Sequence, residues 1–175
     1  GHFSNFELVP MEIHKFGVKL GILYRPLNNF FLDPLLEYLR MKYICPIQVA
    51  KSRIGTREII KLIKNGYSIA LAADQRVGEG LKIPFFNKPA SIPKGAAKFH
   101  LKTGMPILVG FCILSENYQY SLSIKSLNTD NLDKDEGEAI KQINTRFSNL
   151  LEDAIRQNPE QYFWYHRRWP KTMYT

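Results

Sequence analysis

The stretch TREIIKLIKNGYSIALAADQ, residues 56–75, gives the first clear indication of the architecture. Its first half places isoleucines at helical spacing opposite lysines and arginines, which predicts an amphipathic helix that ends at Gly66. Its second half, residues 67–73, is a continuous apolar run that ends at Asp74, as expected of a buried parallel strand. A helix followed at once by such a strand is typical of an α/β layer fold.

The same alternation extends along the rest of the chain. Helical spacing predicts helices over residues 6–16, 31–43, 93–103 and 136–157, and apolar runs predict strands over residues 18–24, 46–50, 105–114 and 118–127. We therefore expect residues 1–175 to form a single domain with a mostly parallel central sheet flanked by helices. In such sheets ligands bind beyond the carboxyl ends of the strands, so the loop after Asp74 is expected to lie at the site.

The chain carries a net charge of +8, and this charge is uneven. Between residues 40 and 102, 13 Lys and Arg stand against three acids. This positive region suits nucleic acid, anionic lipid, a phosphorylated substrate or an acidic carrier protein, and it also suits an ordinary solvated surface. Cys45 and Cys112 lack the spacing of a zinc site. The longest apolar run, residues 105–114, is shorter than the roughly 20 residues that span a bilayer.

His2 and Glu7 are the first candidates for chemistry. An imidazole can take a proton from a hydroxyl near neutral pH, and a carboxylate on its other nitrogen would fix its tautomer. On a regular helix this spacing does not place both side chains on one face, so contact requires His2 to lie in the turn before the helix. The spacing alone also fits a surface histidine and an acid in a first helical turn.

Two further groups of polar residues stand where sites often form. Arg25 follows a predicted strand and Arg53 precedes a predicted helix, and guanidinium groups bind phosphate or carboxylate in a forked geometry. Asp74 and Gln75 end the buried strand and lead into a glycine loop. Solvated arginines and a capping aspartate would give the same pattern.

The chain closes with a mixture of aromatic and basic residues, QYFWYHRRWPK at residues 161–171. Four successive aromatics cannot all face a core from a regular strand or helix. Aromatics mixed with Arg and Lys suit a membrane interface, and they also suit single-stranded nucleic acid or a terminal segment packed across the domain. The candidate lipid contacts are Trp164, Arg167, Arg168 and Trp169.

Five blocks of the sequence, in this order, resemble the lipid A biosynthesis (lauroyl/myristoyl) acyltransferase family. They are GHFSNFE at residues 1–7, YRPLNN at 24–29, Arg53 before its helix, DQRVGEG and PFF within 74–86, and PEQYFWYHRRW at 159–169. This family is related to glycerol-phosphate acyltransferases, which share the pair of a histidine and an acid. The resemblance implies a glycerol-phosphate-acyltransferase-like fold and transfer of a fatty acyl chain from acyl-carrier protein to a hydroxyl of a lipid A precursor.

The resemblance also implies roles for particular residues. His2 would act as general base and Glu7 would orient it, without a metal or other cofactor. The implied substrate-binding residues are Arg25, Arg53, Asp74 and Gln75. The expected partners are acyl-carrier protein, a lipid A precursor and the membrane surface, with no nucleic acid, and the expected location is the cytoplasmic face of the bacterial inner membrane.

Other interpretations share most of these features. An acyl-CoA-dependent glycolipid or glycerol-phosphate acyltransferase would use the same base and the same anion sites. Because the chain begins abruptly at Gly1 and His2, we expect the family's membrane helix and first strand to be missing, and an inactive fragment of such an enzyme is a second alternative. A nucleic-acid-binding module fits the sequence pI of about 9.5 but gives no reason for His2 and Glu7.

Overall fold

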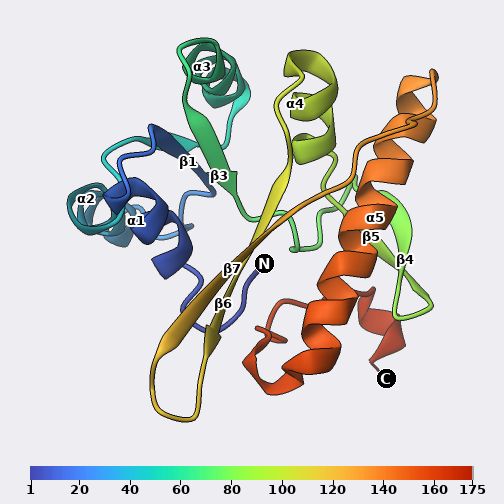
Figure 1. Cartoon of the computed structure of the whole chain (residues 1–175). Helices are drawn as coiled ribbons and strands as arrows, with labels where there is room; N and C mark the ends of the chain where they lie inside the picture. Colours follow the sequence, from blue (N-terminus) through green and yellow to red (C-terminus); the bar gives the residue numbers. More distant parts are fainter. Residues whose placement is uncertain (175) are drawn as a thin grey trace. The chain divides into compact units, whose positions relative to one another are not determined.

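The computed structural model describes residues 1–174, and the chain divides into two compact units (Figure 1). One unit is Glu7–Ala72, and the other joins Gly1–Phe6 to Ala73–Thr175. The segment that carries His2 therefore belongs to the same unit as the long second part of the chain. Within residues 1–174, no helix has both the length and the apolar composition needed to cross a bilayer.

A three-stranded parallel sheet in the order β2-β1-β3 organises the unit Glu7–Ala72. Its elements in chain order are α1 (Leu8–Lys15), β1 (Leu20–Tyr24), α2 (Leu32–Tyr43), β2 (Gln48–Ala50), α3 (Arg53–Lys64) and β3 (Ser68–Leu71). Parallel neighbours need crossover connections, and α2 and α3 supply them. The predicted helix and strand of residues 56–75 are confirmed, although α3 begins earlier, where the Ser52 hydroxyl accepts the N–H of Gly55 at 2.9 Å.

Glycine ends α3 as the sequence predicts. Gly66 has a φ of 79°, and its N–H donates to the carbonyl of Ile63 at 3.0 Å. The next N–H, that of Tyr67, donates to the carbonyl of Leu62 at 3.0 Å. This pair of bonds is a Schellman motif, which needs a residue that tolerates a positive φ. The chain turns sharply there and enters β3 two residues later.

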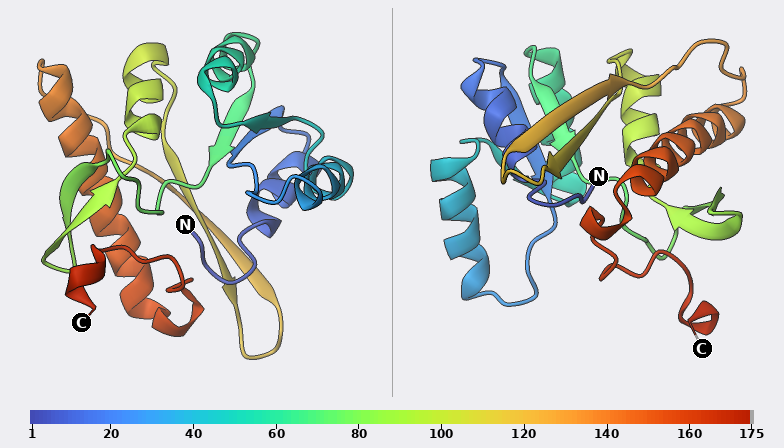
Figure 2. Two further views of the ribbon diagram at one scale, coloured as in Figure 1. Left: turned by 180° about the vertical axis from the view of Figure 1, so that it is seen from behind. Right: turned by 60° about the horizontal axis from the view of Figure 1, so that its bottom comes forward.

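Two antiparallel hairpins and two helices form the unit that joins Gly1–Phe6 to Ala73–Thr175. Its elements are β4 (Leu81–Phe85), β5 (Lys88–Ile92), α4 (Gly95–Thr103), β6 (Leu108–Leu114), β7 (Tyr120–Ser126), α5 (Glu136–Gln157) and the short 3-10 helices η1 (Pro159–Gln161) and η2 (Lys171–Met173). Figures 1 and 2 show α5 running beside the β4–β5 hairpin. The core between these elements includes Phe3, Phe85, Phe111, Ile143 and Leu151.

The mostly parallel central sheet that the sequence predicts is found only in part. Three strands pair in parallel, and the pairs β4–β5 and β6–β7 are antiparallel. The short β6–β7 connection permits only antiparallel pairing. The sequence does not predict β4–β5 because Pro84 and Pro89, which lie opposite each other, argue against strands. A two-residue turn closes this hairpin, with positive φ values of 49° at Phe86 and 60° at Asn87.

Candidate active site

The first residues of the chain pair with the segment that follows α5. Phe3 forms an isolated antiparallel bridge with Tyr162, and the N–H of Phe163 donates to the carbonyl of His2 at 2.9 Å. The side chain of Phe3 is fully buried in the core of this unit. Both the buried ring and the backbone pairing therefore fix the position of His2.

Asp74 binds His2 with both of its carboxylate oxygens. Oδ1 lies 2.6 Å from Nδ1 of His2, and Oδ2 accepts the backbone N–H of His2 at 2.6 Å. Burial favours the neutral acid, but the positive amine of Gly1 and the hydrogen bonds from the His2 ring and backbone outweigh it, so the pKa of Asp74 lies well below its ordinary value. Asp74 is therefore a carboxylate that accepts a hydrogen bond from Nδ1–H. In the neutral ring with this tautomer, Nε2 of His2 carries the lone pair.

The amide of Gln75 lies between two imidazole rings. Its nitrogen is 3.1 Å from Nε2 of His2 and 2.7 Å from Nε2 of His166. An amide nitrogen can only donate, so both imidazole nitrogens are acceptors in this arrangement. Burial lowers the pKa of His166, and the neighbouring His2 lowers it further, which favours the neutral ring. The lone pair of His2 that could accept a proton is thus occupied by the Gln75 amide.

Arg168 and Tyr162 contact Asp74 from the segment after α5. Arg168 is fully buried, and its guanidinium donates to the backbone carbonyl of Asp74. The same guanidinium lies 4.5 Å above the ring of Phe85, a cation–π arrangement. Burial, and then the negative charge of Asp74, raise the pKa of the Tyr162 hydroxyl well above its ordinary range. The position of Asp74 is therefore fixed through its backbone as well as through its side chain.

The carboxylate on Nδ1 of His2 differs from the predicted one. The sequence predicts Glu7 at this place, whereas the structure has Asp74. Glu7 lies just before α1, and its Oε1 accepts two hydrogen bonds from Arg40, from Nε at 2.8 Å and from Nη2 at 2.5 Å. This charge-assisted pair with a guanidinium explains the placement of the Glu7 side chain. A part for Glu7 in orienting His2 stays a prediction.

The two arginines predicted to bind substrate lie in the unit Glu7–Ala72. Arg25 directly follows β1, and Arg53 is the first residue of α3 rather than a residue before it. Both are exposed, and in the described part of the chain neither side chain makes a hydrogen bond or an ion pair. Their donors are therefore accessible to an anionic group, and substrate binding by either arginine stays a prediction.

The four predicted lipid contacts divide into exposed and buried residues. Trp164 and Arg167 are exposed. The prediction for Arg168 is wrong, because its side chain is fully buried against Phe85 and bonded to the Asp74 backbone. Trp169 is half-buried and packs 5.5 Å from the Phe85 ring, so it contributes to the core and not to an outer belt.

Tyr162 and His166 are the site residues that sequence reasoning misses, and Arg168 is singled out there for a different role. All three lie in the block PEQYFWYHRRW, where no local pattern distinguishes them from a membrane belt.

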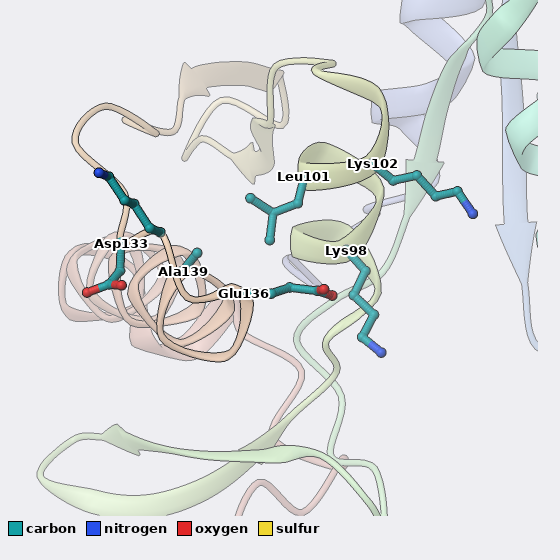
Figure 3. A pocket seen from close by; sticks show the side chains of 7 residues that line it. Lys98, Leu101, Lys102, Asp133, Glu136 and Ala139 are labelled. Carbon is teal, nitrogen blue, oxygen red and sulfur yellow. The ribbon is translucent and has the colours of Figure 1, made fainter.

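A surface pocket of about 600 Å³ is lined by other residues (Figure 3). Lys98, Leu101 and Lys102 come from α4, and Asp133, Lys134, Glu136 and Ala139 come from the loop before α5 and its first turn. The lining mixes charges of both signs and includes none of the residues around His2. We therefore place the candidate active site at His2, Asp74 and Gln75.

A histidine with one ring nitrogen bound by a buried carboxylate is an arrangement that can act as a general base, of the kind that activates a hydroxyl for attack on an acyl group. The family model described as bacterial lipid A biosynthesis acyltransferase matches residues 1–171. The chain belongs to this family, and the family assignment drawn from its five sequence blocks is confirmed. A comparison with curated proteins gives no match.

Proposed function

We propose that this chain transfers a fatty acyl group from acyl-carrier protein to a hydroxyl of a lipid A precursor, with His2 as general base. The family supports acyl transfer in lipid A biosynthesis. The observation that carries the mechanism is the 2.6 Å contact between Nδ1 of His2 and Asp74, because it leaves the lone pair of Nε2 for the acceptor hydroxyl. Membership of the family and the contact between Nδ1 of His2 and Asp74 thus both support acyl transfer with His2 as base.

The proposed reaction balances without a cofactor. The acceptor O–H bond breaks and its proton passes to Nε2 of His2, while the oxygen forms a bond to the thioester carbonyl carbon. The electron pair of the carbonyl moves to its oxygen and returns when the carbon–sulfur bond breaks. The thiolate then leaves with the proton from Nε2. The carboxylate of Asp74 stabilises the imidazolium that forms between these steps.

Charged groups outside this site are proposed to orient the substrates. The exposed guanidinium groups of Arg25 and Arg53 suit phosphate groups of the acceptor or acidic side chains of the carrier protein. Attraction of this kind steers association and weakens as salt is added. The proposal assigns the orientation of His2 to Asp74, whose carboxylate contacts Nδ1, and keeps orientation by Glu7, whose carboxylate is bound by Arg40, as the alternative.

The proposal is tested with labelled acyl-carrier-protein thioester and a lipid A precursor that bears a free 3-hydroxyl on an acyl chain. We expect His2→Ala to lower kcat by on the order of 10²–10⁴, the scale of a general base. His14→Ala, which changes a histidine of α1, is the matched control and should keep normal turnover. A His2→Ala chain with near-normal turnover would falsify the mechanism. An unmodified chain with no turnover would support the alternative of an inactive fragment.

The donor and the acceptor are tested separately. The same acyl chain is offered on acyl-carrier protein and on coenzyme A, and the lipid A precursor is compared with glycerol phosphate. We expect a preference for the carrier protein that declines with salt, because the steering charges are exposed. Equal rates with coenzyme A and glycerol phosphate would favour the related acyltransferase instead.

We also propose that the chain works at a membrane surface, through α2. This helix has no buried residue, although its leucines recur at helical spacing. Its exposed apolar residues, with those just before it, include Phe30, Phe31, Leu32, Leu35, Tyr38 and Leu39. The unit Glu7–Ala72 carries ten Lys and Arg against five acids, which suits anionic lipid. An apolar helix face beside positive charge is the pattern of an interfacial helix.

Vesicle flotation tests this membrane contact. The chain should bind vesicles that contain phosphatidylglycerol more strongly than pure phosphatidylcholine vesicles. Leu35→Glu should weaken partitioning by on the order of tenfold, because one leucine no longer enters the apolar layer. Tyr118→Glu, at an exposed turn between β6 and β7, is the control. Unchanged flotation of Leu35→Glu would exclude α2 as the contact.

A further inference from the structure

The Gln75 amide occupies the place that an acceptor hydroxyl must take. A hydroxyl that loses its proton to His2 has to donate a hydrogen bond to Nε2, and in this structure the Gln75 amide makes that bond at 3.1 Å. His2 is buried, Gln75 is half-buried and His166 is exposed, so the solvent-facing side of this cluster is that of Gln75 and His166. Substrate binding therefore has to displace the amide from His2.

The second hydrogen bond of the amide determines where it goes. The nitrogen carries two hydrogens, and the second is donated to Nε2 of His166 at 2.7 Å. The His166 ring is itself packed edge-on against Phe163, with ring centroids 5.0 Å apart. When a hydroxyl replaces the first bond, the amide stays next to the base, because His166 still holds it. One N–H of Gln75 is then without a partner.

This free N–H lies where negative charge develops in the reaction. The carbonyl oxygen is bonded to the carbon that the attacking oxygen joins, and the attacking oxygen is within hydrogen-bond reach of Nε2. A donor that was itself one hydrogen-bond length from Nε2 is therefore beside that carbonyl oxygen. Neutral amide donors of glutamine and asparagine are among the groups that stabilise oxyanions in acyl transfer.

We propose that Gln75 is a catalytic residue that donates a hydrogen bond to the oxyanion, and that His166 is the positioning residue that holds its amide. As the carbon–oxygen bond forms, the carbonyl electron pair moves to oxygen and accepts the N–H of Gln75 without proton transfer. The same hydrogen bond is released when the oxyanion collapses and the thiolate leaves. This inference rests on the proposed function, since it needs His2 to act as base.

The kinetic test uses substitutions in the whole chain. Gln75→Ala should lower kcat by on the order of 10²–10³ with KM little changed, because an oxyanion donor acts only in the transition state. Arg76→Ala, an exposed neighbour in the same loop, is the control. A Gln75→Ala enzyme with near-normal kcat, together with an inactive His2→Ala, overturns this inference and leaves the proposed function standing. Turnover by His2→Ala overturns the proposed function itself.

Two substitutions separate the hydrogen bond of His166 from its packing. His166→Phe keeps a ring against Phe163 but has no acceptor, and it should lower kcat by roughly 3- to 10-fold, the scale of one hydrogen bond. His166→Gln keeps an acceptor oxygen and should restore most of this loss. Equal kcat values for the two variants would show that His166 does not act through Gln75.

A third measurement needs no turnover. In ¹⁵N NMR spectra of the imidazoles, both His2 and His166 should carry their proton on Nδ1 near neutral pH, because each Nε2 accepts from one amide. Gln75→Ala should remove this constraint from the exposed ring of His166 while Asp74 keeps it on His2. Protonated Nε2 on either ring of the unmodified chain would contradict the arrangement.

Discussion

Replacement of Asp74 by asparagine tests the paired histidine and carboxylate most directly. The carboxylate accepts two hydrogen bonds from His2, one from Nδ1 of the ring and one from the backbone N–H, each 2.6 Å long. Asparagine has the same shape but only one acceptor oxygen, so its amide nitrogen must face one of the two donors. Either the ring gives up its Nδ1–H tautomer or the buried backbone N–H gives up its acceptor.

The first outcome lowers the rate of acyl transfer, and the second lowers the stability of the fold. In the other tautomer Nε2 carries the proton and cannot act as a base, and asparagine at such a carboxylate lowers kcat by on the order of 10⁴. An unpaired buried N–H lowers the free energy of unfolding by about 1–3 kcal/mol. We expect the first outcome, because the ring can change tautomer to accept from the amide whereas the backbone N–H cannot. KM should change little, because substrate binding does not depend on the tautomer.

Glu7→Gln is measured beside it in the same acyl transfer assay, with urea unfolding to follow stability. The pair of Glu7 and Arg40 is partly exposed, so loss of its charge should lower the free energy of unfolding by only about 0.2–1 kcal/mol. Turnover should stay close to that of the unmodified chain. The opposite pattern, an active Asp74→Asn and a Glu7→Gln that loses a hundredfold or more, would refute our reasoning from the 2.6 Å contact and restore Glu7 as the orienting acid.

Three further predictions concern stability and reactivity. Because the pKa of Asp74 is lower in the folded chain than its ordinary 3.8, the unfolded chain binds this proton first as the pH falls. The stability from Asp74 is therefore complete above about pH 4 and declines below it, and acid titration of urea midpoints should show a smaller decline for Asp74→Asn. Arg168→Lys removes the buried guanidinium that bonds the Asp74 carbonyl and lies over the Phe85 ring, and it should lower the free energy of unfolding by about 1–3 kcal/mol, whereas Arg167→Lys on the surface should change it by less than about 0.5 kcal/mol. Burial raises the pKa of both Cys45 and Cys112, so a thiol reagent should label neither in the folded chain and both in urea; rapid native labelling would contradict their burial.

Local sequence patterns predict the elements of this chain well. The helix predicted over residues 136–157 has the bounds of α5, because its apolar positions recur at helical spacing and Asp135 caps its first turn. The α3–β3 unit is found for the same reason. The β4–β5 hairpin is not predicted, because its paired prolines argue against strands. Its turn also places Phe86 in the left-handed region, which such a residue rarely adopts.

The site is predicted less completely because its contacts are not local. His2 and Asp74 are each singled out by the sequence, yet they lie 72 residues apart, and only the tertiary structure brings them together. The spacing of His2 and Glu7 suggests a nearer acid, and no local pattern reveals that Arg40 binds that acid. A family resemblance names such residues but does not show which pairs touch.

The structure changes the interpretation of the aromatic and basic ending, residues 161–171, more than that of any other segment discussed above. Tyr162, His166 and Arg168 each serve the loop of Asp74 and Gln75: the first lies beside the carboxylate, the second holds the amide, and the third bonds the backbone carbonyl. These residues recur at short intervals along one irregular segment, which can turn successive side chains inward and outward as a helix or strand cannot. Aromatic residues packed with arginine are therefore ambiguous in sequence, because a buried arginine over a phenylalanine ring and an exposed one at a bilayer have the same neighbours in the chain. Only burial separates them, and here it assigns Tyr162 and Arg168 to supporting the base, whereas residues 163–167 between them are exposed.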